Sequence, residues 1–151
     1  MTSHKPILIA HRGNLNGPNP SMENLPSYVE IALSRGYNCE IDVWYDETTG
    51  FSLGHDYGQY PVNEVFLAQP GLWCHSKNLS ALHKMLSNSW IHCFWHQSDD
   101  FTLTSSNFIW SYPGKSLSLQ SICVLPELNG LQYEDIQECY GICTDYPKWF
   151  K

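Results

Sequence analysis

Ionisable side chains of complementary kinds lie at the ends of four successive apolar runs in the first half of the chain. These side chains are His11 with Arg12, Glu40 with Asp42, His55 with Asp56, and His75 with Lys77. Two histidines can act as general acid and general base, and a pair of carboxylates can hold a hard divalent cation. Arginine and lysine can bind phosphate oxygens. The combination indicates metal-assisted chemistry on a phosphate group.

The two carboxylates have a spacing that brings them together. Glu40 and Asp42 are two residues apart, which places both on the same face of a strand, and His75 and Lys77 have the same spacing. Carboxylates inside a protein are unfavourable unless a cation or hydrogen bonds compensate them, and Mg²⁺ or Ca²⁺ is the natural cation for oxygen ligands. A lone pair of this kind is more often a solvated strand edge or a salt bridge. Its occurrence beside the other strand ends favours a site.

Strands must position these side chains, and eight apolar runs are typical of strands. The runs are 6–13, 38–44, 51–56, 71–78, 91–97, 107–114, 121–127 and 141–147. Helical spacing of apolar residues predicts helices over 25–33 and 79–86, the second capped by Asn78. Shorter helical segments are expected at 62–69 and 132–139. Strands that alternate with helices usually pair in parallel.

Eight strand–helix units predict a closed (β/α)8 barrel of the TIM type, whose sites gather at the carboxyl ends of the strands. Such barrels need roughly 200 residues or more, and this chain has 151. The connections 44–50 and 98–107 are also too short for an ordinary covering helix. We therefore predict a single α/β domain over residues 1–151, a compact barrel with several helices shortened or missing. An open, partly parallel α/β sheet is the alternative.

The composition limits the partners of such a protein. Its net charge is −7, with only eight lysines and arginines, which argues against nucleic acid as a partner. No apolar run approaches the ~20 residues of a membrane span, so we expect no membrane anchor. Helices missing from a barrel would leave apolar surface exposed, and a homodimer is one way to cover it.

The cysteines indicate a compartment. The chain opens MTSHKP without a secretory leader, and its six cysteines include no CxxC pair. Most of them lie in apolar strand-like runs, where cysteine packs as a small hydrophobic residue. We expect reduced core thiols and a cytoplasmic protein.

Four short motifs follow one another at a specific spacing. They are HRG at 11–13, EN at 23–24, E-x-D at 40–42 and HD at 55–56. In this order they resemble the glycerophosphodiester phosphodiesterases, whose wider relatives include the phosphatidylinositol-specific phospholipases C. The run GICTDYP (141–147) is similar to the closing strand of these enzymes. The resemblance is strong over residues 7–56 and absent at 90–130.

The resemblance implies a (β/α)8 barrel and a role for each matched residue. By this correspondence His11 and His55 are the general acid and base, and Glu40 and Asp42 bind the metal. Arg12, Lys77 and Asn24 bind the phosphate or the substrate, and Glu23 and Asn24 match the pair that shapes the loop beside the site. Where the family has a third, glutamate ligand, this chain has His75, which we also expect at the metal. Imidazole suits borderline ions better than Mg²⁺ or Ca²⁺. The metal preference could therefore differ, water and substrate could complete a two-carboxylate site, or binding could be weaker.

The expected function is that of a metal-dependent hydrolase, a phosphodiesterase of lipid metabolism that acts on a small glycerophosphodiester-like molecule. Two alternatives stay open: a non-catalytic phosphate- or phosphodiester-binding barrel, and a phospholipase-like relative that acts on a lipid headgroup. Asp145, at the end of the last strand, and His96 are further candidates for the site. Trp110 and Tyr112 could form an apolar wall for the alcohol moiety or pack in the core.

Overall fold

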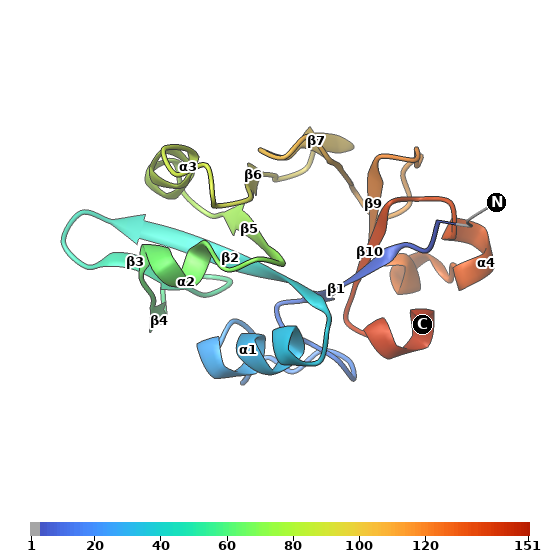
Figure 1. The fold of residues 1–151 in the computed structure, drawn as a ribbon, viewed down its shortest axis with the longest axis horizontal. Helices are drawn as coiled ribbons and strands as arrows, with labels where there is room; N and C mark the ends of the chain where they lie inside the picture. Colours follow the sequence, from blue (N-terminus) through green and yellow to red (C-terminus); the bar gives the residue numbers. More distant parts are fainter. Residues whose placement is uncertain (1–3) are drawn as a thin grey trace.

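The computed structural model describes residues 4–151, and one curled, mixed sheet of ten strands dominates it (Figure 1). Its parallel strands are, in spatial order, β6 (Cys93–Trp95), β5 (Leu72–Ser76), β2 (Asn38–Asp46), β1 (Ile7–His11), β10 (Gly141–Thr144), β9 (Ser121–Val124) and β8 (Ile109–Ser111). β7 (Phe101–Leu103) pairs with β8 in antiparallel fashion. Because the seven strands from β6 to β8 in this order are parallel, their carboxyl ends meet at one rim of the sheet.

A β-hairpin and several short helices complete the fold. β3 (Gly50–Leu53) pairs antiparallel with the second half of β2, and β4 (Tyr60–Pro61) pairs antiparallel with β3. The helices are α1 (Pro26–Ser34), α2 (Glu64–Leu67), α3 (Leu79–Leu86) and α4 (Tyr133–Ile136), with 3-10 turns η1 (Pro126–Asn129) and η2 (Pro147–Phe150). No helix within residues 4–151 is long and apolar enough to cross a membrane.

The two longer helices agree with the sequence pattern. α1 and α3 match the helices predicted at 25–33 and 79–86. Asn78 is the N-cap of α3, as predicted, because its Oδ1 accepts a hydrogen bond from the backbone N–H of Ala81 at 3.0 Å. Both helices lie on the outer side of the sheet (Figure 1).

The prediction of a closed (β/α)8 barrel is wrong, because the sheet is open and its strands are not all parallel. The run at 51–56, predicted as the third parallel strand, forms β3 and returns beside β2. A parallel connection needs a crossover of about a dozen residues, and only residues 47–49 separate β2 from β3. A connection this short folds back as a hairpin. The alternative, an open and partly parallel α/β sheet, describes the fold.

The two ends of the sheet approach each other without closing the ring. The backbone N–H of Ser105, just after β7, donates to the carbonyl of Cys93 in β6 at 2.8 Å. The Thr102 hydroxyl donates to the carbonyl of Trp95 at 2.7 Å. Among residues 4–151, however, no strand ladder joins β6 to β7. The result is a strongly curled half-barrel.

Alternation of side chains along each strand separates two apolar layers. The concave face of the sheet holds an inner core of Ile9, Trp73, Phe94, Trp110, Ile122, Val124 and Cys143. On the outer face, Val29 of α1, Met85 of α3 and Ile41 of β2 are fully buried. All six cysteines are buried and unpaired in the part of the chain that the structure describes, as predicted for core thiols.

Candidate functional site

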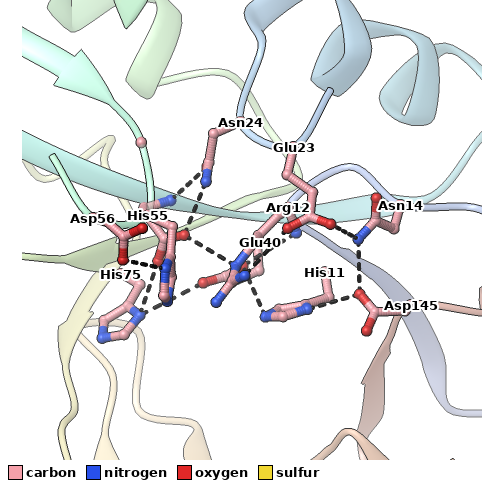
Figure 2. A network of polar contacts seen from close by, with 12 residues as sticks. His11, Arg12, Asn14, Glu23, Asn24, Glu40, His55, Asp56, His75 and Asp145 are labelled. Carbon is pink, nitrogen blue, oxygen red and sulfur yellow. Dashed lines mark hydrogen bonds and ion pairs between the residues drawn. The ribbon is translucent and has the colours of Figure 1, made fainter. Parts of the chain in front are cut away.

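A pocket of about 410 Å³ opens at the carboxyl ends of the parallel strands, above the inner core. Its lining includes eight of the ionisable residues singled out above, namely His11, Arg12, Glu40, Asp42, His55, His75, Lys77 and His96, whereas Glu23, Asp56 and Asp145 do not line it. Along β1, β2 and β5 the site residues point to the same face of the sheet as the inner core. They therefore lie on the concave face, between the inner core and the carboxyl ends of the strands. Figure 2 shows the polar contacts that link most of them.

Glu40, Asp42 and His75 form one compact group in this pocket. Each offers a ligand atom, and these atoms lie within 4.8 Å of one another. The pairing of β2 with β5 brings them together, because Asp42 and His75 are direct register partners. His75 Nδ1 lies 3.3 Å from Asp42 Oδ1 and 3.6 Å from Glu40 Oε2, and both carboxylates are almost completely buried. The group could hold a metal ion.

The ring of His75 is oriented for this contact. Its Nε2 lies 2.8 Å from the backbone carbonyl of His96, an acceptor, so Nε2 donates and Nδ1 is the atom that faces the carboxylates. The ring also stacks on Phe94, with centroids 5.1 Å apart. A hydrogen bond from the second ring nitrogen is the usual way in which proteins fix a metal-binding histidine. The donor set, two carboxylates and one imidazole, therefore fits a divalent cation.

Without a metal, a proton on His75 compensates the carboxylates. Burial lowers the pKa of His75, but hydrogen bonding to Asp42 and Glu40 outweighs burial and raises it to about 9. Burial raises the pKa of Asp42, yet the hydrogen bond from His75 and the charge of Arg12 hold it well below its usual range. A metal ion bound at Nδ1 has to displace this proton, so metal affinity should rise with pH.

The stability of the metal-free protein is expected to depend on pH through His75. A raised pKa in the folded state means that protonation stabilises the fold, fully below the ordinary histidine pKa of 6.5 and no longer above about 9. A shift of this size corresponds to about 3 kcal/mol. Urea unfolding in EDTA at pH 6 and pH 9.5, for the wild type and His75→Gln, measures the effect. The difference in stability between the two proteins should shrink by about that amount at high pH, and a constant difference would contradict the assignment.

His11 and Asp145 form a hydrogen-bonded pair at the ends of β1 and β10. His11 Nδ1 lies 2.8 Å from Asp145 Oδ1, and His11 Nε2 lies 4.0 Å from Glu40 Oε1. The amide of Asn14 also donates to Asp145 Oδ1 at 2.8 Å. Asp145 thus takes the orienting position that a carboxylate has beside a catalytic histidine, leaving Nε2 directed toward the metal group.

The surroundings of this pair favour a charged imidazole. Burial lowers the pKa of His11, but the hydrogen bond to Asp145 and the charge of Glu40 outweigh burial and raise it. Burial raises the pKa of Asp145, but the hydrogen bond from His11 outweighs burial and lowers it. The raised pKa favours the imidazolium, the form that can donate a proton from Nε2.

The HRG and EN motifs pack against each other. Arg12 and Asn24 both have a left-handed backbone, with φ of 55° and 67°. Nη1 of Arg12 lies 3.2 Å from Glu23 Oε1, and Nε of Arg12 lies 3.3 Å from Asp42 Oδ2. Gly13 fits beside them because a Cβ there would lie 2.8 Å from the Tyr28 ring. The sharp turn after β1 therefore directs the Arg12 guanidinium toward Asp42, in the group of Glu40, Asp42 and His75.

Asn24 lies beside the pocket and binds Asp42 with both ends of its amide. Its Nδ2 donates to Asp42 Oδ2, and its Oδ1 accepts the backbone N–H of Asp42, both at 2.9 Å. These bonds fix the carboxylate for a ligand on its other side. Asn24 is therefore placed to position a metal ligand, while its contact with substrate stays a prediction.

His55 and Lys77 also line the pocket. His55 follows β3, its side chain is 47% exposed, and its Nδ1 lies 2.9 Å from Asp56 Oδ1. Lys77 follows β5, where its backbone N–H donates to the carbonyl of Val43 at 2.8 Å. Both side chains are therefore accessible to a ligand, with His55 on the antiparallel hairpin instead of a barrel strand.

Two polar residues of the site were not singled out from the sequence. Asn14 binds Asp145, as described above, and its Oδ1 accepts a hydrogen bond from the Tyr28 hydroxyl at 3.1 Å. Glu127 accepts the backbone N–H of Asp145 at 3.0 Å and the Thr144 hydroxyl at 2.8 Å. Glu127 ends the apolar run 121–127, so its place at a strand end is a signal that could have found it. For Asn14 the only signal is that it follows HRG directly.

Comparison with known protein families, with curated proteins and with solved structures finds no match in any of the three. The function of the chain is therefore inferred from the chemistry of the pocket itself.

Proposed function

We propose that the chain is a metal-dependent phosphodiesterase that acts on a small glycerophosphodiester-like substrate. The observation that carries this proposal is that His11 and the group of Glu40, Asp42 and His75 line one pocket, with His11 Nε2 4.0 Å from Glu40 Oε1 and Asp145 bonded to the other ring nitrogen of His11. A phosphate bound to a cation at this group would lie next to the proton on His11. The motif order of the sequence supports the same reaction class.

The chain's own residues have distinct tasks in this proposal. A divalent cation, when bound, supplies positive charge to the non-bridging phosphate oxygens. Lys77 and Arg12 add positive charge on the same side of the pocket. His55 accepts a proton from the attacking water as the new P–O bond forms. His11 donates its Nε2 proton to the alkoxide oxygen as the old P–O bond breaks, and Asp145 stabilises the imidazolium before that transfer.

Hydrolysis of a glycerophosphodiester is expected to require a divalent ion. Treatment with EDTA should lower the rate about 100-fold or more, because a metal contributes several kcal/mol to stabilisation of the transition state. Adding back Mg²⁺, Ca²⁺, Mn²⁺ or Zn²⁺ in turn should restore the rate and identify the ion that suits a site with one imidazole ligand. The same series followed by thermal unfolding reports binding separately from turnover. Full activity in EDTA would contradict the proposal.

A second function has one observation in its favour. The charges of the metal group are already compensated, because His75 faces both carboxylates and Arg12 pairs with Glu23 and Asp42. A non-catalytic protein that binds a phosphodiester could use the same pocket without turnover. Ligand-induced stabilisation with no hydrolysis of any phosphodiester, in any metal, distinguishes this function from the first.

The six unpaired cysteines support a reducing, cytoplasmic setting for either function.

A further inference from the structure

The pocket has two chemically different sides. The ionisable side comes from β1, β2 and β5 and carries the metal-binding group, His11 and Lys77. The facing side comes from the ends of β8 and β9 and from η1, and it presents Tyr112, Leu125 and Leu128. We refer to these three side chains as the apolar wall.

The apolar wall is partly open to solvent. Leu128 is 69% exposed and Tyr112 is 41% exposed, although both line the pocket. Below them, Trp110 and Val124 are buried in the inner core, so the wall continues a packed apolar layer. A hydrocarbon group laid against the wall would remove apolar surface from water, which is favourable in proportion to the area covered.

Leu125 is held in the wall at a cost in backbone energy. Its φ is 48° and its ψ is 56°, the left-handed region that glycine and asparagine adopt most easily. Pro126 follows it, and the backbone N–H of Leu125 donates to the carbonyl of Cys143 at 2.7 Å, which fixes the turn from β9 into η1. Strained residues of this kind concentrate at ligand sites. A leucine at such a position gives the pocket an apolar side chain that glycine could not provide.

The wall is continuous with the metal-binding group. The ring of Tyr112 lies 5.5 Å from the ring of His96, centroid to centroid. The carbonyl of His96 accepts the hydrogen bond that orients His75. A phosphate on the ionisable side would therefore have one of its ester groups within reach of the wall. Another apolar hollow, lined by Phe101, Leu103 and Ile109 of strands β7 and β8, has no ionisable residue in its lining.

We propose that the apolar wall binds a hydrocarbon substituent carried by one ester oxygen of the substrate. The preferred substrate is then an amphiphilic phosphodiester taken from solution, with glycerol on one ester oxygen and an apolar alcohol on the other. This inference rests on the proposed function, because it places the phosphate at the metal-binding group. It adds a specificity that the ionisable residues alone do not have.

The test uses glycerophosphate esters of methanol, butanol and hexanol, which differ only in apolar length. With each methylene that reaches the wall, kcat/KM should rise about 2- to 4-fold. Leu128→Ser should lower the hexyl-to-methyl ratio of kcat/KM about 5-fold or more, and Leu128→Met should keep most of it. Leu119→Ser is the matched control, because Leu119 is 74% exposed and does not line this pocket. It should leave the ratio unchanged.

The outcomes separate the wall from the reaction. Hydrolysis of all three esters at the same rate would overturn the wall and leave the proposed function standing. If no ester is hydrolysed, calorimetric binding of the hexyl and methyl esters decides: tighter binding of the hexyl ester that Leu128→Ser removes supports the wall, and equal or absent binding overturns it. Sedimentation with phosphatidylcholine vesicles should leave the protein in the supernatant. Binding to the vesicles would overturn a soluble amphiphile as the occupant.

Discussion

Replacing His11 by glutamine is expected to lower kcat/KM for phosphodiester hydrolysis by about 10²- to 10⁴-fold, the contribution of a positioned general acid. Glutamine keeps a polar side chain near Asp145 but has no proton of suitable acidity to donate at the Nε2 position. The measurement is steady-state hydrolysis of a glycerophosphodiester in saturating metal. His83→Gln is the matched control, because His83 lies exposed on α3, and it should retain wild-type rates.

The pH profile tests the role of Asp145 in the same reaction. A general acid must be protonated, so the alkaline limb of kcat/KM should follow the raised pKa of His11. Asp145→Asn removes a cause of that raised pKa, so the limb should move to lower pH. A purely structural role of Asp145 would lower activity without moving the limb. Wild-type rates in His11→Gln would exclude His11 as the acid.

Replacing Asp42 by asparagine is expected to abolish the metal-induced rise in Tm and to destabilise the metal-free protein. Asp42 is 1% exposed, and its carboxylate faces both Arg12 and His75. Removing one partner from a buried ion pair typically costs about 3 to 5 kcal/mol, because the remaining charges lose their compensation. Thermal and urea unfolding, each with and without the activating metal, measure the two effects separately.

Asp46→Asn is the matched control, the same substitution at the exposed end of the same strand. It should leave the metal response intact. If Asp42→Asn does not fold, Glu40→Gln removes a metal ligand with the same expected loss of the metal response. A rise in Tm as large as that of the wild type in either folded variant would refute the assignment of the metal group.

Much of the local structure could be predicted from the sequence. The spacing of apolar residues predicted α1 and α3, and Asn78 predicted the start of α3. The same pattern placed Glu40 with Asp42 on one strand face. These features depend on neighbours within a few positions, so the order of residues along the chain is enough to define them.

The global topology could not be obtained in this way. Eight apolar runs are compatible with a closed barrel and with an open sheet, because the pattern reports which face of a strand is buried and not which strand lies beside it. The direction of β3 depended on the short connection at residues 47–49, and the end of the sheet depended on the β7–β8 hairpin. The length of a connection limits whether the next strand can be parallel, whereas the number of apolar runs does not.

The same distinction between local pattern and tertiary structure applies to the candidate site. The sequence by itself determined which chemical groups are available at successive strand ends, namely three histidines, a carboxylate pair, an arginine and a lysine, and their order resembles that of the phosphodiesterases. Only the tertiary structure decided that Asp145 orients His11, that His75 Nδ1 faces Glu40 and Asp42, and that Asn24 binds Asp42. The physical reason is that these contacts join distant parts of the chain, His11 and Asp145 being 134 residues apart. The register of β1 with β10 creates the first contact and that of β2 with β5 the second, and no local pattern encodes a register between strands so far apart.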